Sequence, residues 1–555
     1  MHGLMMSRRF SIAALIEAAD GNHGATPIVS HTPEGTIHRY TWREAHARAR
    51  RLANALRALG VAPGDRVGTL AWNGHRHLEI YYAVSGMGAV CHTINPRLFP
   101  DQVGYIVNHA EDAVLFVEPG FLPLVESLAD RLATVKAVVV MTDDAHMPAT
   151  RLSGTLCYED AVAAASDDFA WPTLDEESAS SLCYTSGTTG NPKGVLYSHR
   201  STVIHALASA MPDSFGLSAR DAVLPVVPMF HVNAWGLPYS TAMVGAKLVM
   251  PGPHLDGASL QRLITAEGVT MTAGVPTVWL GLLAHLRETG AAIAPLERVI
   301  VGGSAAPPAM VREFRERHGV AVRHAWGMTE MSPIGTINMP RYGSDVADEA
   351  EYARQVKVGR PVFGVEMKIV DADDRPLPHD GVAFGDLKVR GPCVCRAYYK
   401  EESSAAHDAD GWFATGDVAT IDADGYLQIT DRSKDVIKSG GEWISSIDLE
   451  NIAVGHPAVA EAAVVGVPHP KWDERPLLIV VPRAGATVDR ADLLAYYAGK
   501  VAKWWIPDDV AVVDALPHTA TGKLLKMKLR QDFRGHRWGD TGGDRAGLKP
   551  APTKE

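Results

Sequence analysis

Apolar and polar residues follow two periods along the first 320 residues, one typical of helices and one typical of buried strands. Thr41 through Glu44 matches a capping box, and apolar residues then recur at helical spacing from Ala45 to Leu59. Gly60 follows, at the position where a glycine commonly ends a helix. The pattern therefore predicts a helix that begins after Thr41 and ends before Gly60.

Short apolar runs bounded by turn residues predict buried strands. They are Arg66–Trp72, Val114–Val117, Ala137–Met141, Ala222–Val227, Lys247–Met250, Val269–Ala273 and Arg298–Val301. Helical patterns near residues 259–267, 277–289 and 307–318 separate or follow the later runs. Strands that alternate with helices are typical of mostly parallel sheets covered by helices, so the predicted fold class is α/β, with two such sheets.

The pattern changes twice towards the C-terminus. Residues 356–430 hold short segments rich in Gly, Asp and Pro, which predict a small antiparallel, barrel-like β unit at the end of a large domain over residues 1–431. Helices near 446–454 and 489–502 and strands near 461–467 and 477–482 then predict a small α+β domain over residues 432–537. Residues 538–555 are polar and rich in Gly and Pro, and we expect a disordered tail.

The composition is that of an ordinary globular protein, with 555 residues, 46% hydrophobic and 21% charged residues, and a net charge of -11. This charge gives no reason to expect nucleic acid or an anionic membrane as a partner. No stretch approaches the roughly 20 apolar residues of a membrane span. Five cysteines do not make a disulfide framework in so long a chain, and we expect a reduced, cytoplasmic setting.

One loop has the composition of a phosphate-binding site. Thr185 to Gly194 reads TSGTTGNPKG and follows the predicted strand Leu182–Tyr184. Its glycines allow backbone N–H groups to converge on an anion, hydroxyls add donors and Lys193 adds charge. The spacing is not that of a P-loop, and the alternative for such a segment is a flexible surface turn.

Five further motifs follow in order. They are Gly302–Ala305, Trp326–Glu330, Thr415–Asp417, Asp431–Asp435 and Thr521–Lys523. With the loop at 185–194, they closely resemble the adenylate-forming superfamily of acyl- and aryl-CoA synthetases, luciferases and peptide-synthetase adenylation domains. Residues 229–237, 273–279 and 439–446 are most similar to the medium- and long-chain fatty acyl-CoA synthetases. The resemblance implies ATP, Mg²⁺ and CoA as cofactor and co-substrates, a mobile C-terminal domain and a homodimer through the N-terminal region.

The resemblance also implies roles for individual residues. It makes Lys523 the principal catalytic residue, supported by Glu330, Thr185 and His231, with Thr185 and Glu330 holding Mg²⁺. The implied ATP-binding residues are Thr185, Ser186, Gly187, Thr188, Thr189, Gly190, Lys193, Gly303, Ser304, Ala305, His324, Ala325, Trp326, Gly327, Thr329, Asp417, Arg432, Lys434, Lys438 and Trp443. Lys434 matches the hinge of the small domain, and Ser439, Gly440 and Gly441 match the CoA-binding segment. Trp326 and Ala325 depart from the Tyr and Gly that relatives usually carry.

The class of carboxylic acid substrate is predicted from the absence of an Asp in the region 228–236. Relatives that activate amino acids place an Asp there, whereas this chain has none, and a buried ammonium without a counter-charge is costly. An apolar pocket is expected from His231, Trp235, Val275, Ala305 and Met328, with Trp235 either gating it or packing in the core. Three functions stay open: a medium- or long-chain acyl-CoA ligase; an enzyme for a methylthio- or aryl-alkanoate, or one that loads a carrier protein; and a non-catalytic binder.

Overall fold

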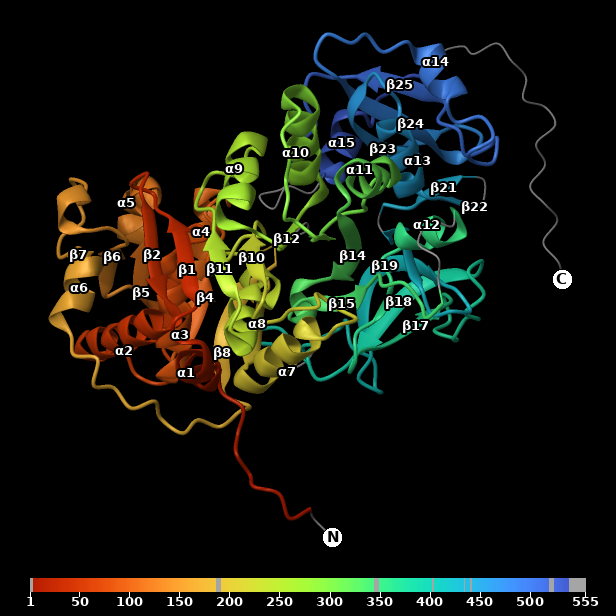
Figure 1. Cartoon of the computed structure of the whole chain (residues 1–555). Helices are drawn as coiled ribbons and strands as arrows, with labels where there is room; N and C mark the ends of the chain where they lie inside the picture. The colour runs from red at the N-terminus through yellow and green to blue at the C-terminus, as the bar shows by residue number, and fades with distance from the viewer. Residues whose placement is uncertain are drawn as a thin grey trace.

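The computed structural model describes residues 3–185, 191–343, 349–401, 404–433, 435–439, 442–518 and 524–538. The large N-terminal part contains two sheets, each with helices on both faces, as predicted. Figure 1 shows this part in red to green, with the C-terminal residues in blue at its upper right and residues 3–10 extending away from the body. None of the described helices is both long and apolar enough to cross a bilayer.

The first sheet has seven strands in the order β7-β6-β5-β3-β4-β8-β9, parallel except for the last pair. The strands are β3 (Arg66–Leu70), β4 (Val90–Thr93), β5 (Asp112–Val117), β6 (Ala137–Val140), β7 (Leu156–Cys157), β8 (Ala179–Tyr184) and β9 (Gly194–Ser198). The helices of this region are α1 (Ile12–His23), α2 (Trp42–Ala58), α3 (His75–Gly86), α4 (Pro100–Ala110), α5 (Leu122–Leu128), α6 (Tyr158–Ala164) and α7 (His199–Ala210).

The second sheet has nine strands in the order β16-β15-β14-β13-β12-β10-β11-β1-β2, and its centre from β14 to β1 is parallel. The strands are β1 (Pro27–His31), β2 (Ile37–Thr41), β10 (Ala222–Pro225), β11 (Lys247–Met250), β12 (Met271–Gly274), β13 (Arg298–Val301), β14 (Ala321–Gly327), β15 (Ile334–Ile337) and β16 (Arg360–Pro361). Its helices are α8 (Leu237–Val244), α9 (Gly257–Glu267), α10 (Pro276–Thr289), α11 (Pro308–His318) and α12 (Glu349–Gln355).

Alternating side chains on the strands show how the layers pack. Val114 and Phe116 of β5 join the core that holds residues of α1, α2, α3 and α8, whereas Leu115 and Val117 face α4 and α5. On β13, Ile300 belongs to that same central core while its two neighbours face α9, α10 and α11. Because side chains alternate along a strand, both sheets are buried on both faces, with one helical layer between them.

The helix predicted from Thr41 is confirmed in detail. Thr41 accepts a hydrogen bond from the Glu44 N–H, and the Glu44 carboxylate accepts from the Thr41 N–H at 2.8 Å. At the other end, the Gly60 and Val61 N–H groups donate to the Arg57 and Leu56 carbonyls, each at 3.0 Å.

 The φ of Gly60 is 82°, which lies in the left-handed region that glycine adopts without a steric penalty, so the helix ends where the sequence predicted.

Residues after β16 form a four-stranded antiparallel sheet in the order β17-β18-β19-β20, drawn in teal in Figure 1. The strands are β17 (Glu366–Val370), β18 (Phe384–Arg390), β19 (Phe413–Ile421) and β20 (Leu427–Arg432). The predicted antiparallel unit is therefore present. Its four strands hydrogen-bond in this order, and Gly359 pairs with Leu427 of β20.

The C-terminal part is the predicted small α+β unit. Its five strands are β21 (Ile437–Ser439), β22 (Glu442–Ile444), β23 (Val459–His469), β24 (Asp473–Pro482) and β25 (Asp509–Val512), and its helices are α13 (Ser446–Val454), α14 (Arg490–Ala495) and α15 (Lys526–Asp532). The predicted helix over 489–502 is wrong beyond Ala495. Tyr497 is buried there and donates to the Leu449 carbonyl at 2.7 Å, and Gly499 has a φ of 75°, so the chain continues as turns.

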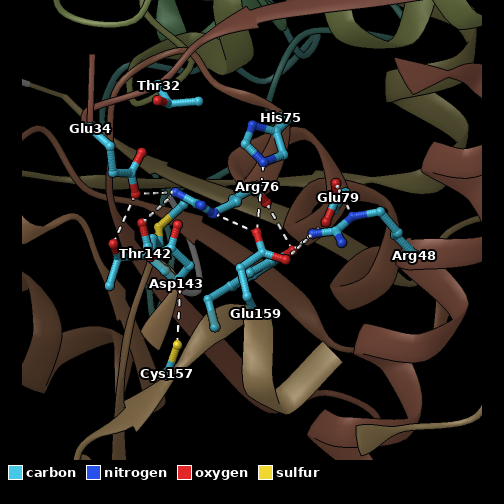
Figure 2. A network of polar contacts seen from close by, with 12 residues as sticks. Thr32, Glu34, Arg48, His75, Arg76, Glu79, Thr142, Asp143, Cys157 and Glu159 are labelled. Atoms are coloured by element: carbon cyan, nitrogen blue, oxygen red, sulfur yellow. Dashed lines mark hydrogen bonds and ion pairs between the residues drawn. The ribbon is translucent and has the colours of Figure 1, made fainter. Parts of the chain in front are cut away.

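A network of buried charges joins α2, α3 and α6 in the N-terminal part (Figure 2). Arg76 donates to Glu159 and to Glu34, both at 2.7 Å, and Arg48 donates to Glu79 at 2.8 Å and to Glu159 at 2.9 Å. Burial by itself raises the pKa of Glu159, but the nearby His75 imidazole, 3.8 Å away, and the guanidiniums of Arg48 and Arg76 outweigh it and hold that pKa well below its usual range.

We expect Glu159→Gln to lower the free energy of unfolding by about 2 kcal/mol at pH 7, because it removes one of the two carboxylate partners of both Arg48 and Arg76 and leaves only Glu79 and Glu34. A folded-state pKa below the unfolded value stabilises the protein above the unfolded pKa of about 4.3, and this contribution is lost as the pH falls further. The difference from wild type should therefore be constant between about pH 5 and 8 and shrink below about pH 4.3 in urea titrations. Glu177→Gln, at an exposed carboxylate, is the control, and a pH-independent difference would contradict the assignment.

Candidate active site

The carboxyl ends of several strands meet at one large cavity. The segments after β8, β10, β12, β13 and β14 all contribute to its lining, which places the cavity where α/β sheets commonly bind ligands. Its volume is about 1230 Å³, and residues of the C-terminal unit form its opposite wall. Most of the site residues that were predicted from the sequence, and that the structure describes, line this cavity.

The part of the cavity next to β8 holds the predicted phosphate and metal residues. Thr185 lies at the end of β8, and its N–H donates to the Lys193 carbonyl at 2.8 Å, which closes the base of the loop. Ser186, Gly187, Thr188, Thr189 and Gly190 lie outside the described residues. Lys193 lines the cavity with an exposed ammonium 3.5 Å from Glu401.

Glu330 is buried in the short 3-10 helix Thr329–Met331 and lines the same cavity. The described residues contain no cluster of three or more His, Cys, Asp or Glu side chains that could enclose a metal. Glu330 and Thr185 are hard oxygen donors that both line the cavity, and this donor set fits Mg²⁺, which takes few protein ligands when phosphates and water supply the rest.

Two donors fix the carboxylate of Asp417, which is buried on β19. Trp326 donates from Nε1 to Oδ2 at 2.9 Å, and Arg432 donates from Nε to Oδ1 at 2.8 Å. All three side chains line the cavity. Because each carboxylate oxygen has more than one lone pair, Asp417 keeps the capacity to accept further hydrogen bonds from a bound ligand.

The turn after β13 and the end of β14 complete this wall. Gly303, Ser304, Ala305, Ala325, Gly327, Met328 and Thr329 all line the cavity. His324 also lines the cavity and is largely buried: its Nδ1 donates to the Val356 carbonyl at 2.8 Å, its Nε2 accepts from the Ala306 N–H at 3.3 Å, and burial lowers its pKa. His324 thus supports the turn through two backbone contacts.

An apolar wall, formed by segments of the second sheet and its connections, continues the cavity. It is lined by His231, Val232, Trp235, Val275, Leu280 and Ile334. The ring of Trp235 lies against the backbone of Gly302, where a Cβ would come within 2.9 Å of Cη2. Gly302 therefore provides the space that this indole occupies.

The backbone that carries Trp235 is a left-handed turn. Val232, Asn233, Ala234 and Trp235 have φ values of 47°, 50°, 48° and 55°, and Gly236 has 74°. The left-handed conformation costs about 1–2 kcal/mol for each residue other than glycine, so tertiary contacts must stabilise the turn. Asn233 supplies them, since it donates to Ser181 at 3.0 Å and accepts from Tyr81 at 3.4 Å.

The C-terminal unit contributes the residues that flank the predicted catalytic segment to the cavity lining. His518 and Leu524 line the cavity on either side of residues 519–523, while Lys523 itself lies outside the described residues. Lys438 and Ser439 do not line it: Lys438 is exposed, and Ser439 is buried and accepts from Arg475 at 3.0 Å. Lys434, Gly440, Gly441 and the side chain of Trp443 also lie outside the description.

Several cavity residues were missed from the sequence. Tyr398 donates to Glu330 at 2.9 Å, and Lys526 pairs with Glu450 at 2.7 Å. Asp448 also lines the cavity, and burial raises its pKa to about 6, with the Asp431 carboxylate adding to the shift. No sequence motif singles out these side chains, so only their contacts in the folded structure identify them as site residues.

Comparisons with known proteins agree with this geometry. Residues 15–399 match the AMP-binding enzyme family, and residues 448–523 match the AMP-binding enzyme C-terminal domain. A 3-methylmercaptopropionyl-CoA ligase of Ruegeria lacuscaerulensis is 56% identical over 535 residues, which cover 96% of this chain and 99% of that protein. A medium-chain-fatty-acid–CoA ligase of Ectopseudomonas oleovorans is 52% identical over 96% of this chain and 98% of its own length. The crystal structure of an anthranilate CoA ligase in complex with anthranoyl-AMP has a TM-score of 0.85 at 27% identity and covers 95% of this chain and 98% of its own.

Proposed function

Because the chain belongs to the AMP-binding enzyme family, we propose that it is an AMP-forming acyl-CoA ligase that joins a carboxylic acid to CoA through an acyl-adenylate. The observation that carries this proposal is the single cavity that Thr185, Glu330, Trp326 and Asp417 share with an apolar wall. ATP and the acid can meet there, and the site accommodates both a polyanion and an apolar tail.

The first half-reaction is attack of the acid's carboxylate on the α-phosphorus of ATP, with pyrophosphate leaving. Both reactants are anions, so the site must neutralise charge and align them. We assign phosphate binding to the loop 185–193, ribose binding to Asp417 and Arg432, and the adenine-binding face to Trp326 and the turn Gly303–Ala305. Mg²⁺ held by Thr185 and Glu330 would supply further positive charge at the phosphates.

In the second half-reaction the CoA thiol attacks the acyl carbonyl and AMP leaves. We propose that residues 432–537 rotate as a unit about Lys434 between the two steps, relative to residues 1–431. His518 and Leu524 face the cavity while Ser439 does not, which supports an adenylation orientation for this structure. Rotation would withdraw Lys523 and bring Ser439–Gly441 to the acyl-adenylate.

The acid that we propose has an unbranched, uncharged tail. The segment 228–236 has no carboxylate, and the wall around His231 and Trp235 is largely apolar. Medium-chain fatty acids and 3-methylmercaptopropionate, the acids named for the two relatives, both have such tails. The preference for a medium- or long-chain fatty acid stays a prediction.

Trp235→Ala is expected to broaden the range of accepted chain lengths, because it removes the indole that lies against Gly302. The ratio of kcat/KM for a C12 acid to that for a C4 acid should rise by about 10-fold, the effect of a few buried methylenes. Trp412→Phe, outside the cavity, is the control. An unchanged chain-length profile in Trp235→Ala would mean that this indole serves core packing alone.

We also propose a homodimer through the N-terminal region and a reducing, cytoplasmic location. Leu4, Met5 and Met6 are almost fully exposed, which supports a contact with a second copy. Light scattering of the full chain, before and after removal of residues 1–10, tests the dimer.

All five cysteines are free, which fits a reducing compartment.

The function is tested with a panel of C2 to C18 fatty acids, 3-methylmercaptopropionate and aromatic acids. AMP release is measured with and without CoA. We expect AMP release that requires CoA and is fastest with an unbranched acid. CoA-independent turnover in the presence of a carrier protein would indicate carrier loading, and the absence of pyrophosphate exchange with every acid would indicate a non-catalytic binder.

A further inference from the structure

Tyr398 lies between two residues of the proposed site that are far apart in the sequence. Its hydroxyl donates to Oε1 of Glu330 at 2.9 Å, and Nζ of Lys193 lies 4.5 Å from the centre of its ring. Lys193 also pairs with Glu401 at 3.5 Å. Tyr398 is half-buried and lines the cavity. One side chain therefore contacts both the carboxylate proposed to hold Mg²⁺ and the lysine of the phosphate loop.

The backbone around Tyr398 is fixed at both ends. The Cys395 N–H donates to the Glu330 carbonyl at 2.8 Å, and the Tyr399 N–H donates to the Gly194 carbonyl at 2.8 Å. Between these two bonds, Cys395 and Tyr398 pack against the buried cluster of Cys183, Val195 and Tyr197. The segment 395–399 thus bridges the 3-10 helix of Glu330 and the start of β9, and it holds the phenol where its hydroxyl donates to Oε1 of Glu330.

We propose that Tyr398 is a positioning residue that orients the Glu330 carboxylate for a divalent cation, an inference that rests on the proposed function. A carboxylate at the end of a flexible side chain samples several rotamers, and a hydrogen bond to one oxygen selects one of them while the other oxygen stays available. Groups that orient metal ligands in this way typically contribute 10- to 100-fold to metal affinity. The ring alone would serve packing equally well, so the hydroxyl is the atom to test.

The experiment uses the full-length enzyme with a non-hydrolysable ATP analogue, so that no turnover occurs, and Mn²⁺ as the probe. Binding of Mn²⁺ is followed by electron paramagnetic resonance for wild type, Tyr398→Phe and Tyr399→Phe. We expect about 10-fold weaker Mn²⁺ binding in Tyr398→Phe. Tyr399→Phe, whose ring contacts His109 instead, should match wild type. Adenylation by Tyr398→Phe should recover at high Mg²⁺, which a packing defect would not allow.

Glu330→Gln and the double variant separate this inference from the proposed function. We expect Glu330→Gln to weaken Mn²⁺ binding and Tyr398→Phe to add nothing further in the Glu330→Gln background, because the tyrosine acts through that carboxylate. Weak binding in Glu330→Gln with normal binding in Tyr398→Phe would overturn the role of Tyr398 and leave the metal assignment of Glu330 intact. Losses of Mn²⁺ affinity that add in the double variant would have the same meaning. Normal binding in Glu330→Gln would overturn the metal assignment and this inference together.

Discussion

Replacing Lys523 by alanine is expected to lower the rate of acyl-adenylate formation by about 10²- to 10³-fold. A mobile ammonium can bridge the carboxylate and the α-phosphate as negative charge develops between them. Two other lysines of the described small domain, Lys500 and Lys526, line the cavity, but each already has a partner, and the ammonium of Lys500 lies over the Tyr496 ring. Lys526, three residues further on, is buried against Glu450 and Ser446. Lys438 is on a different segment, which does not line the cavity.

The two half-reactions are measured separately in this variant. Pyrophosphate exchange reports adenylation, and thioester formation from a supplied acyl-adenylate reports the second step. We expect the second step to be largely unchanged, because the proposed rotation would withdraw Lys523 before it. Lys528→Ala, at an exposed lysine on α15, is the matched control. Equal losses in both half-reactions would show that Lys523 has no role specific to adenylation.

Replacing Asp417 by alanine is expected to raise the KM for ATP by about 10²-fold with little change in kcat. The carboxylate would accept two ribose hydrogen bonds of about 1.5 kcal/mol each, and these are present in the ground state and the transition state alike. The substitution also removes the acceptor for the Trp326 indole and the Arg432 guanidinium, so the two side chains that flank it lose their fixed orientation.

Steady-state kinetics with ATP as the varied substrate tests this expectation. Asp410→Ala, at an exposed carboxylate of the same β unit, should leave the KM unchanged. A variant that lowers kcat with an unaltered KM would place Asp417 in the chemical step and not in nucleotide binding. Circular dichroism of each variant confirms that the fold is retained.

Elements with local causes were predictable from the sequence. The helix after Thr41 begins at a capping box and ends at Gly60 because both signals act within a few residues of the chain. The strand β13 was predicted with its bounds for a similar reason, since a short run of β-branched residues favours a buried strand. The helix predicted beyond Ala495 failed where a distant contact, from Tyr497 to Leu449, outweighed the local pattern.

The cavity depended on contacts between distant residues. The left-handed turn at Val232–Trp235 opposes the local preference of four non-glycine residues, and only its packing against Ser181 and Tyr81 allows it. No sequence pattern predicts such a turn. The position of the Trp235 indole against Gly302 follows from it, so the shape of the acyl wall was not readable from the residue types.

The sequence by itself determined the chemistry, because the phosphate loop, Glu330, Asp417 and Lys523 occur in motifs whose residue types and order already imply adenylation. The tertiary structure decided which other side chains contact these residues. Tyr398 and Glu330 are separated by 68 positions, and their contact forms only when the segment 395–399 packs between two elements. Hydrogen bonds of this kind depend on the folded path of the whole chain, whereas motif chemistry depends on residues that are neighbours in sequence.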